Sequence, residues 1–114
     1  MKCIYALKPC PWCRKTPKFI MYYGNEYLIN ENWSPTIYCN NLCCHIRPEL
    51  RTKSTIRRKQ KINIPVIKEK VEIVINYWNE GNNICPYEGI ELDFMEIAKE
   101  GLKYFPGAKI IEIT

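Results

Sequence analysis

The sequence has little histidine, little glycine and no long apolar run: His occurs once and Gly five times in 114 residues. No segment approaches the ~20 apolar residues that a membrane-spanning helix needs, so we expect no membrane partner. The apolar part of residues 1–13 is too short for a signal peptide, and we therefore expect a cytoplasmic protein. A Ser/His/Asp set and a glycine-rich phosphate loop are both missing. These absences predict that the protein is not an enzyme.

Cysteine, by contrast, is abundant, and six of the seven cysteines lie in residues 1–45. An odd number cannot pair completely as internal disulfides, and clustered cysteines in a reducing compartment are typical of metal sites. A chain of 114 residues fits one compact domain, which a metal ion would help to stabilise. Two cysteines lie apart from the clusters, and we expect them to be small buried apolar residues or exposed thiols: Cys3 and Cys85.

The first cluster is a Cys-Pro-Trp-Cys turn that runs from Cys10 to Cys13. Two thiolates at this spacing suit Zn²⁺, and Pro11 favours the turn because its ring fixes φ near about −65°. Redox proteins use the same spacing. No strand–helix–strand pattern surrounds this turn, however, and a second cysteine group begins at Cys39. The pattern therefore favours a zinc-binding knuckle over a redox pair.

The second cluster holds Cys39, Cys43, Cys44 and His45. Its spacing is longer than a second Cys-x-x-Cys, because position 42 is Leu. Cys43 or Cys44 fits the place of the fourth ligand, and His45 is a third candidate. Four protein ligands leave no open position on the metal, so the ion would be structural. We expect one Zn²⁺ that is held by Cys10, Cys13, Cys39 and one of Cys43 or Cys44.

Between the clusters the residues favour short antiparallel strands. The predicted strands are 17–23, 27–30 and 36–39, and turn residues separate them at 24–26 and 32–35. Five aromatic residues in this region are expected to cover a thin sheet, although exposed rings could instead stack on unpaired bases: Tyr22, Tyr23, Tyr27, Trp33 and Tyr38.

Residues 65–80 give the clearest helical pattern. One apolar face recurs at helical spacing, with Asn63 and Pro65 suited to its start and Gly81 to its end. The face consists of Ile67, Val71, Val74, Ile75 and Trp78. Trp78 ends this face, so we expect its ring to lie against the sheet.

A second helix is predicted over 91–104 and a last strand over 108–113. The predicted fold class is therefore α+β: a small zinc ribbon of three short antiparallel strands and two Cys knuckles, packed against an amphipathic helix. We divide the chain into a zinc-ribbon domain, 1–83, and a C-terminal helix–strand extension, 84–114, that packs on the same domain. The first part contains a basic insertion at 46–63, which the sequence allows as a loop, a frayed helix or a hairpin arm.

The net charge of +5 is distributed unevenly. Residues 1–83 have 14 Lys and Arg against 6 Asp and Glu, whereas residues 84–114 have 3 against 6. Cations this dense can neutralise phosphates or meet an acidic protein surface. We call the seven cations of the insertion the basic arm, and we expect it to bind a partner protein or nucleic acid: Arg47, Arg51, Lys53, Arg57, Arg58, Lys59 and Lys61.

Three parts of the sequence together resemble one protein family. The first knuckle reads Leu-Lys-Pro-Cys-Pro-x-Cys over 7–13, a second knuckle follows a strand pair, and a helix ends in Trp78-Asn79. This order resembles the restriction alleviation (Lar-type) zinc-ribbon proteins of phages and other mobile elements, over about residues 5–81. Arg14 stands where that family usually has Gly, the second knuckle is longer, and the basic insertion is additional.

The resemblance implies a counter-defence protein of a phage or mobile element, acting in the host cytosol without enzymatic activity. Such a protein would bind and modulate or inhibit a host nucleic-acid-targeting defence complex, either restriction–modification or CRISPR–Cas. The alternative is a zinc-ribbon regulator that binds nucleic acid directly through the basic arm. The sequence leaves the oligomeric state open.

Overall fold

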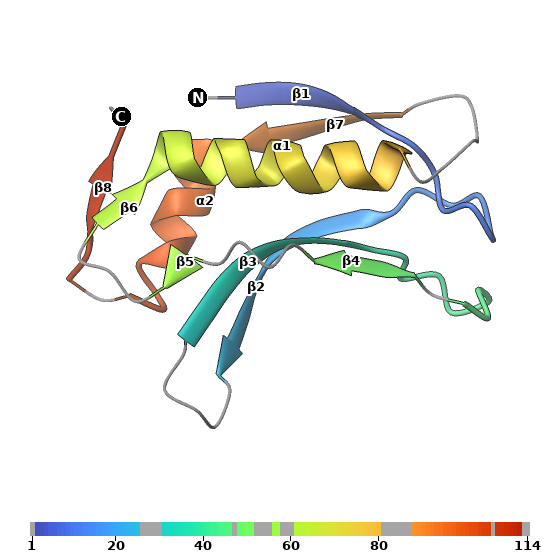
Figure 1. The fold of residues 1–114 in the computed structure, drawn as a ribbon, viewed down its shortest axis with the longest axis horizontal. Helices are drawn as coiled ribbons and strands as arrows, with labels where there is room; N and C mark the ends of the chain where they lie inside the picture. The colour runs from blue at the N-terminus through green and yellow to red at the C-terminus, as the bar shows by residue number, and fades with distance from the viewer. Residues whose placement is uncertain are drawn as a thin grey trace.

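The computed structural model describes residues 2–25, 31–46, 48–51, 56–57, 61–80, 88–105 and 107–112. In the described residues, strands β1 to β6 precede helix α1, and strand β7 stands between α1 and α2 (Figure 1). In order they are β1 Lys2–Leu7, β2 Lys18–Asn25, β3 Glu31–Tyr38, β4 Glu49–Arg51, β5 Ile56–Arg57, β6 Lys61–Asn63, α1 Ile64–Glu80, β7 Glu88–Asp93, α2 Phe94–Gly101 and β8 Lys109–Ile111. The predicted α+β class is confirmed.

The largest sheet is antiparallel and centred on β3. Strand β2 lies on one side of β3, and β4 and β5 both pair with its other side. The predicted strand 17–23 corresponds to β2, which begins at Lys18 and continues to Asn25, so the predicted turn at 24–26 is wrong for Gly24 and Asn25. The predicted strand 27–30 lies outside the described residues. The predicted turn at 32–35 is wrong, because these residues belong to β3.

Pro35 shows why this turn prediction failed. The residue has no N–H to contribute to a sheet, and proline in strands is found at edges or at breaks in pairing. The pairing beside Pro35 is interrupted. Arg51 of β4 lies opposite Thr36, and Ile56 of β5 lies opposite Trp33. Two residues of β3 thus separate these pairs on one side, whereas four residues of sequence separate them on the other. Strand β3 can therefore contain Pro35, because no residue of β4 or β5 pairs with it at this point.

Two smaller sheets connect distant parts of the sequence. Strands β1 and β7 pair antiparallel, with Lys2 opposite Asp93, and strands β6 and β8 pair parallel, with Ile62 opposite Ile110. Residues 84–114 thus share both of these sheets with the first part of the chain.

The predicted second helix is wrong at its start, since 91–93 belong to β7 and the helix begins at Phe94. In β7 the buried Leu92 stands between two acidic residues, an alternation of period two that suits a strand with one buried face. Asp93 then caps the helix, because its carboxylate accepts a hydrogen bond from the Met95 N–H at 3.1 Å. The strand consequently passes directly into α2.

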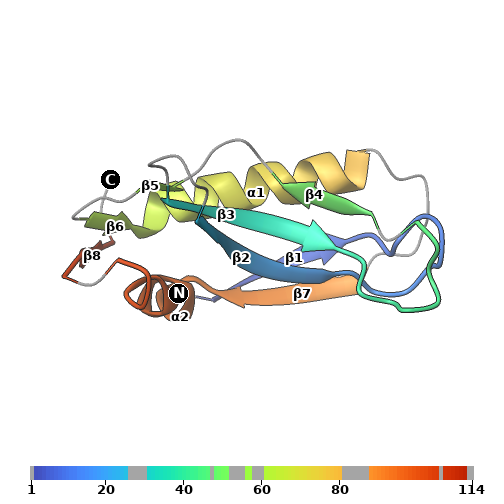
Figure 2. The same ribbon diagram turned by 90° about the horizontal axis from the view of Figure 1, so that it is seen from below.

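Helix α1 confirms the prediction for 65–80. All five residues of the predicted apolar face are buried, and the Asn63 side chain accepts a hydrogen bond from the Val66 N–H at 3.3 Å. Gly81, the predicted end signal, lies outside the described residues. Helix α1 contacts β1, β3, β4 and α2, so it lies against both antiparallel sheets (Figures 1 and 2).

The core is completed by residues from near the end of the chain. Trp33 of β3 is fully buried and meets Phe105 edge to face, with ring centroids 6.1 Å apart. Phe94 is also fully buried and meets Tyr5 of β1 in the same way at 6.3 Å. In the described part of the chain, neither helix combines the length and apolarity needed to cross a membrane.

Candidate metal centre

Four cysteines converge on one point. Their Sγ atoms all lie within 4.8 Å of one another: Cys10, Cys13, Cys39 and Cys44. Two pairs lie closer, Cys13–Cys39 at 3.5 Å and Cys10–Cys44 at 4.0 Å. A tetrahedral ion with metal–sulfur bonds of about 2.3 Å separates its sulfurs by about 3.8 Å. The cluster is therefore compatible with a single metal ion.

The first two sulfurs come from the turn after β1. Cys10 donates its N–H to the Lys15 carbonyl at 2.9 Å and accepts from the Arg14 N–H at 2.8 Å, which closes the turn around Cys13. Arg14 adopts φ 62°, in the left-handed region that costs a side chain about 1 kcal/mol or more. This conformation gives a physical reason for the Gly of the resembled family at this place.

The second two sulfurs follow β3, and the structure separates the candidates that the spacing left open. Cys44 is buried in the cluster, whereas Cys43 and His45 are exposed. Asn41 organises the turn, since its carbonyl accepts the Cys44 N–H at 3.0 Å and its side chain accepts the Cys43 N–H at 3.1 Å. Four residues separate Cys39 from Cys44, two more than in a Cys-x-x-Cys turn, and one of them, Leu42, is 81% exposed.

The environment divides the thiols by acidity. Burial raises the pKa of Cys10 and raises the pKa of Cys39 to about 12. A hydrogen bond from the Asn41 side chain lowers the pKa of Cys13 to about 6. Several thiolates so close together would repel one another in a buried place, and a divalent cation would relieve that repulsion.

The end of α1 holds the first turn in place. Trp78 is buried, as expected, and its Nε1–H donates to the Lys8 carbonyl at 2.8 Å. Asn79 accepts the Lys8 N–H and donates to the Ala6 carbonyl, both at 2.9 Å. The Trp78-Asn79 pair therefore fixes the residues that lead from β1 to Cys10, a role that packing patterns alone did not reveal for Asn79.

The basic arm is described only in part. Arg51, Arg57 and Lys61 lie on the backbones of β4, β5 and β6, so a frayed helix is wrong for these residues. The other four positions of the arm lie outside the described residues: Arg47, Lys53, Arg58 and Lys59.

The aromatic residues between the clusters differ in exposure. Trp33 belongs to the core, Tyr38 is partly buried and Tyr22 is exposed. The Tyr23 side chain and all of Tyr27 lie outside what the structure describes. The expectation that these rings cover the sheet therefore holds for Trp33, which has no exposed face for a base.

Exposed apolar residues beside the cysteines were missed by the sequence analysis. Trp12, between Cys10 and Cys13, is 59% exposed, and Tyr77, beside Trp78, is 58% exposed. A hollow of about 210 Å³ lies between them, which we call the knuckle hollow; it is lined by Pro11, Trp12, Pro48, Glu49, Leu50, Tyr77 and Trp78. The sequence did contain a signal for this exposure, because a Trp inside a short Cys-x-x-Cys turn has few apolar residues to pack against.

No family model matches the chain, and neither a curated protein nor a solved structure matches it. The resemblance to the restriction alleviation proteins therefore stays a prediction.

Proposed function

We propose that the four cysteines bind one Zn²⁺ as a structural ion, and that the surrounding strands form a zinc ribbon. The sulfur separations and the thiolate-rich ligand set support zinc. With four cysteine ligands the metal has no open position for water or substrate, so the ion serves folding and not catalysis. The protein acts by binding.

The knuckle hollow carries the binding proposal. Large aromatic side chains at a rigid apolar hollow are typical anchors of protein–protein interfaces. Trp12 is exposed although the ligands on either side of it are fixed, and Leu50 and Trp78 supply apolar walls. A side chain from a partner protein would enter the hollow between Trp12 and Tyr77.

We propose that this partner belongs to a host nucleic-acid-targeting defence complex, of the restriction–modification or CRISPR–Cas type. The support is the Leu-Lys-Pro-Cys-Pro-x-Cys turn together with Trp78-Asn79, which the resembled counter-defence family shares. The contacts of Trp78 and Asn79 with Ala6 and Lys8 give those residues a physical reason to occur together.

The test is the protection of an infecting phage in host cells that carry one defence system. Wild-type protein should raise the plating efficiency of a targeted phage, and Trp12→Ala should lower that gain about ten-fold, as loss of an interface anchor does. Ile4→Ala is the matched control, because Ile4 is an exposed apolar residue on β1, outside the knuckle hollow. No protection against either class of system would overturn the counter-defence proposal.

The second candidate is direct nucleic-acid binding through the basic arm, which the cation density favours. In that case the isolated chain would bind DNA or RNA, and its affinity would fall steeply with salt. Reversal of Arg57, Arg58 and Lys59 to Glu would flatten this dependence. If a defence protein is the partner instead, the reversal would mainly slow association with that protein.

A further inference from the structure

Among the strands with an open edge in the part of the chain that the structure describes, β2 and β7 line the same hollow. Strand β2 pairs with β3 alone, and β7 pairs with β1 alone. An open edge carries backbone N–H and C=O groups that an additional strand can satisfy. Strands β2 and β7 belong to different sheets, and Phe19 of β2 and Leu92 of β7 line the same hollow.

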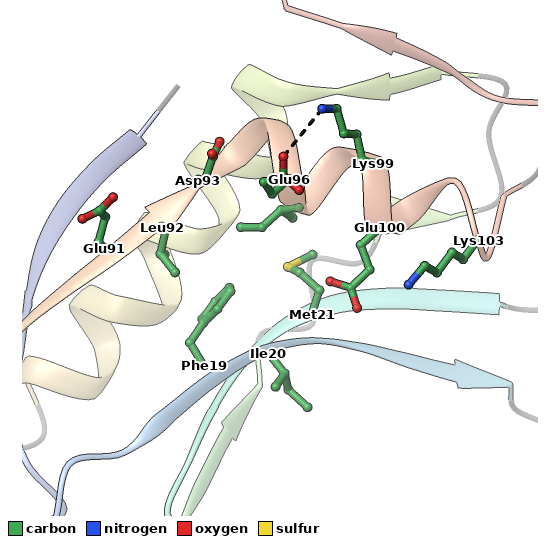
Figure 3. A pocket seen from close by; sticks show the side chains of 11 residues that line it. Phe19, Ile20, Met21, Glu91, Leu92, Asp93, Glu96, Lys99, Glu100 and Lys103 are labelled. Atoms are coloured by element: carbon green, nitrogen blue, oxygen red, sulfur yellow. Dashed lines mark ion pairs between the residues drawn. The ribbon is translucent and has the colours of Figure 1, made fainter.

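A continuous groove lies between these two strands and α2. One hollow of about 610 Å³ and another of about 350 Å³ share Phe19, Glu91 and Leu92, and together we call them the β2–β7 groove. Figure 3 shows Phe19 and Met21 of β2 pointing into the groove from one side and Leu92 of β7 pointing into it from the other. The floor of the groove is therefore apolar, and on the β2 side it is formed by every second residue of the strand.

The rim of the larger hollow is acidic in a protein of net charge +5, whereas the smaller hollow is lined by one lysine, Lys18, and one acid, Glu91. Four carboxylates and two lysines line the larger hollow: Glu91, Asp93, Glu96, Glu100, Lys99 and Lys103. Glu91, Glu96 and Glu100 are exposed, whereas Asp93 is partly buried and caps α2. Glu91 pairs with Lys2 at 3.9 Å and Glu96 pairs with Lys99 at 3.6 Å. Such pairs contribute little, about 0–1 kcal/mol, so they exchange readily for a ligand's cations.

We propose that the β2–β7 groove binds an extended basic segment of a partner protein, which adds to the open edge of β2 as a further strand. Backbone hydrogen bonds to β2 supply affinity, and alternate side chains supply specificity. Apolar residues of the segment contact Phe19, Met21 and Leu92, while its lysines or arginines face Glu91 and Glu100.

The acidic rim selects this occupant over others. Phosphate groups of nucleic acid are repelled by it. A second copy of the chain, paired through its own β2, would bring two acidic rims together. The groove shares no residue with the knuckle hollow, so the two proposals fail or succeed independently.

The probe is an acetylated, amidated Lys-Val-Lys-Ile-Lys-Val-Lys peptide with a fluorescent label, titrated with the full-length zinc-loaded protein and followed by anisotropy. We expect saturable binding, and at least about ten-fold weaker binding of the same peptide with Glu in place of Lys. A third peptide has N-methyl groups on the backbone nitrogens of alternate residues, so one of its two edges cannot donate backbone hydrogen bonds. It should also bind at least about ten-fold more weakly.

The protein variants test the rim. Glu91→Lys combined with Glu100→Lys should weaken the basic peptide at least about ten-fold. Glu69→Lys, an exposed charge reversal on α1 outside the groove, should change the affinity by less than about two-fold. Zinc content and circular dichroism check that each variant is folded, and the peptide controls test the proposal on unaltered protein.

Three results would overturn the proposal. They are absence of saturable binding to wild-type protein, equal affinity for the basic and acidic peptides, and undiminished affinity for the N-methylated peptide. Dimerisation of the free chain that blocks the peptide, seen by sedimentation, would replace the partner segment with a second copy. Protection of the amides of 19–21 from hydrogen exchange by the basic peptide would place the added strand on β2.

Discussion

The side-chain oxygen of Asn79 accepts a hydrogen bond from the Lys8 N–H at 2.9 Å, across 71 residues of sequence. The amide group of the same side chain donates to the Ala6 carbonyl, so one residue satisfies two backbone groups at the exit of β1. Cys10 follows two residues after Lys8. The position of the first cysteine turn is therefore set from the end of α1.

Asn79→Ala should lower the free energy of unfolding by about 1–3 kcal/mol, because two backbone groups lose their partner. Zinc affinity should fall with it, since the turn before Cys10 is no longer fixed. Chemical denaturation and a competitive zinc titration measure the two effects. Glu80→Ala, an exposed change at the next position, is the control and should alter neither quantity. If Asn79→Ala changed neither the free energy of unfolding nor the zinc affinity, the turn would not depend on Asn79 for its position.

Trp78→Phe separates the hydrogen bond from the packing of the ring. The variant keeps an aromatic ring but loses the donor to the Lys8 carbonyl, and we expect a loss of about 1–2 kcal/mol. Trp78→Ala should cost about 3–5 kcal/mol because it also leaves a cavity. Thermal unfolding measures both, with the exposed Tyr77→Ala as control. Equal losses for the two Trp78 variants would contradict a separate contribution from ring packing.

Neighbouring cysteines give the sharpest test of the metal centre. Purified protein should contain one zinc ion, and Cys44→Ser should lower its zinc affinity about 100-fold or more by removing a ligand. Cys43→Ser is chemically the same change one residue earlier and should leave zinc content and unfolding temperature unaltered. Elemental analysis after dialysis gives the answer. The assignment of the fourth ligand is wrong if the two variants exchange these outcomes.

Zinc affinity should rise with pH. The buried thiols Cys10 and Cys39 have raised pKa values, so both are protonated near neutral pH and must release a proton when metal binds. Cys13, with a pKa of about 6, is already ionised there. Protons therefore compete with zinc, and release of at least these two protons raises the apparent affinity by at least about two decades per pH unit. Titrations against a competing chelator between pH 6.5 and 8 measure the slope, and a flat profile would contradict it.

Gly101→Ala should destabilise the protein although alanine favours helices by about 1 kcal/mol. A Cβ at this last residue of α2 would stand 2.7 Å from Cη2 of Trp33 and 3.2 Å from Cδ1 of Ile62. The Trp33 ring is fully buried and has no room to move, so the clash outweighs the gain. Thermal unfolding should show a lower midpoint. The exposed Lys99→Ala in the same helix should leave the midpoint within error of the wild type.

Local signals in the sequence predicted α1 well. Its apolar face repeats over several turns, and Asn63 caps it within the same segment, so no distant partner is needed to define it. The boundary between β7 and α2 was predictable only in part. Ile90, Phe94 and Ile97 recur at helical spacing, whereas Ile90 and Leu92 also alternate as in a strand. The partner strand β1 decides it, through a pairing that spans almost the whole chain.

The spacing of the cysteines in the sequence predicted three of the four candidate metal ligands. Cys10, Cys13 and Cys39 followed from the two clusters, but the choice between Cys43 and Cys44 depends on the hydrogen bonds of Asn41. The turn at 32–35 failed for a related reason: Pro35 and its neighbours have turn chemistry, and pairing with β2 overrides it.

The distribution of the core along the chain also orders its assembly during synthesis. All four converging cysteines lie within 10–44, so they leave the ribosome well before Phe94 and Phe105, which fill the space around Tyr5 and Trp33. The nascent chain can thus bring its four cysteines together while most of its hydrophobic interior is still missing. The Zn²⁺ that we propose would then hold the early strands together until the last residues of the core are synthesised.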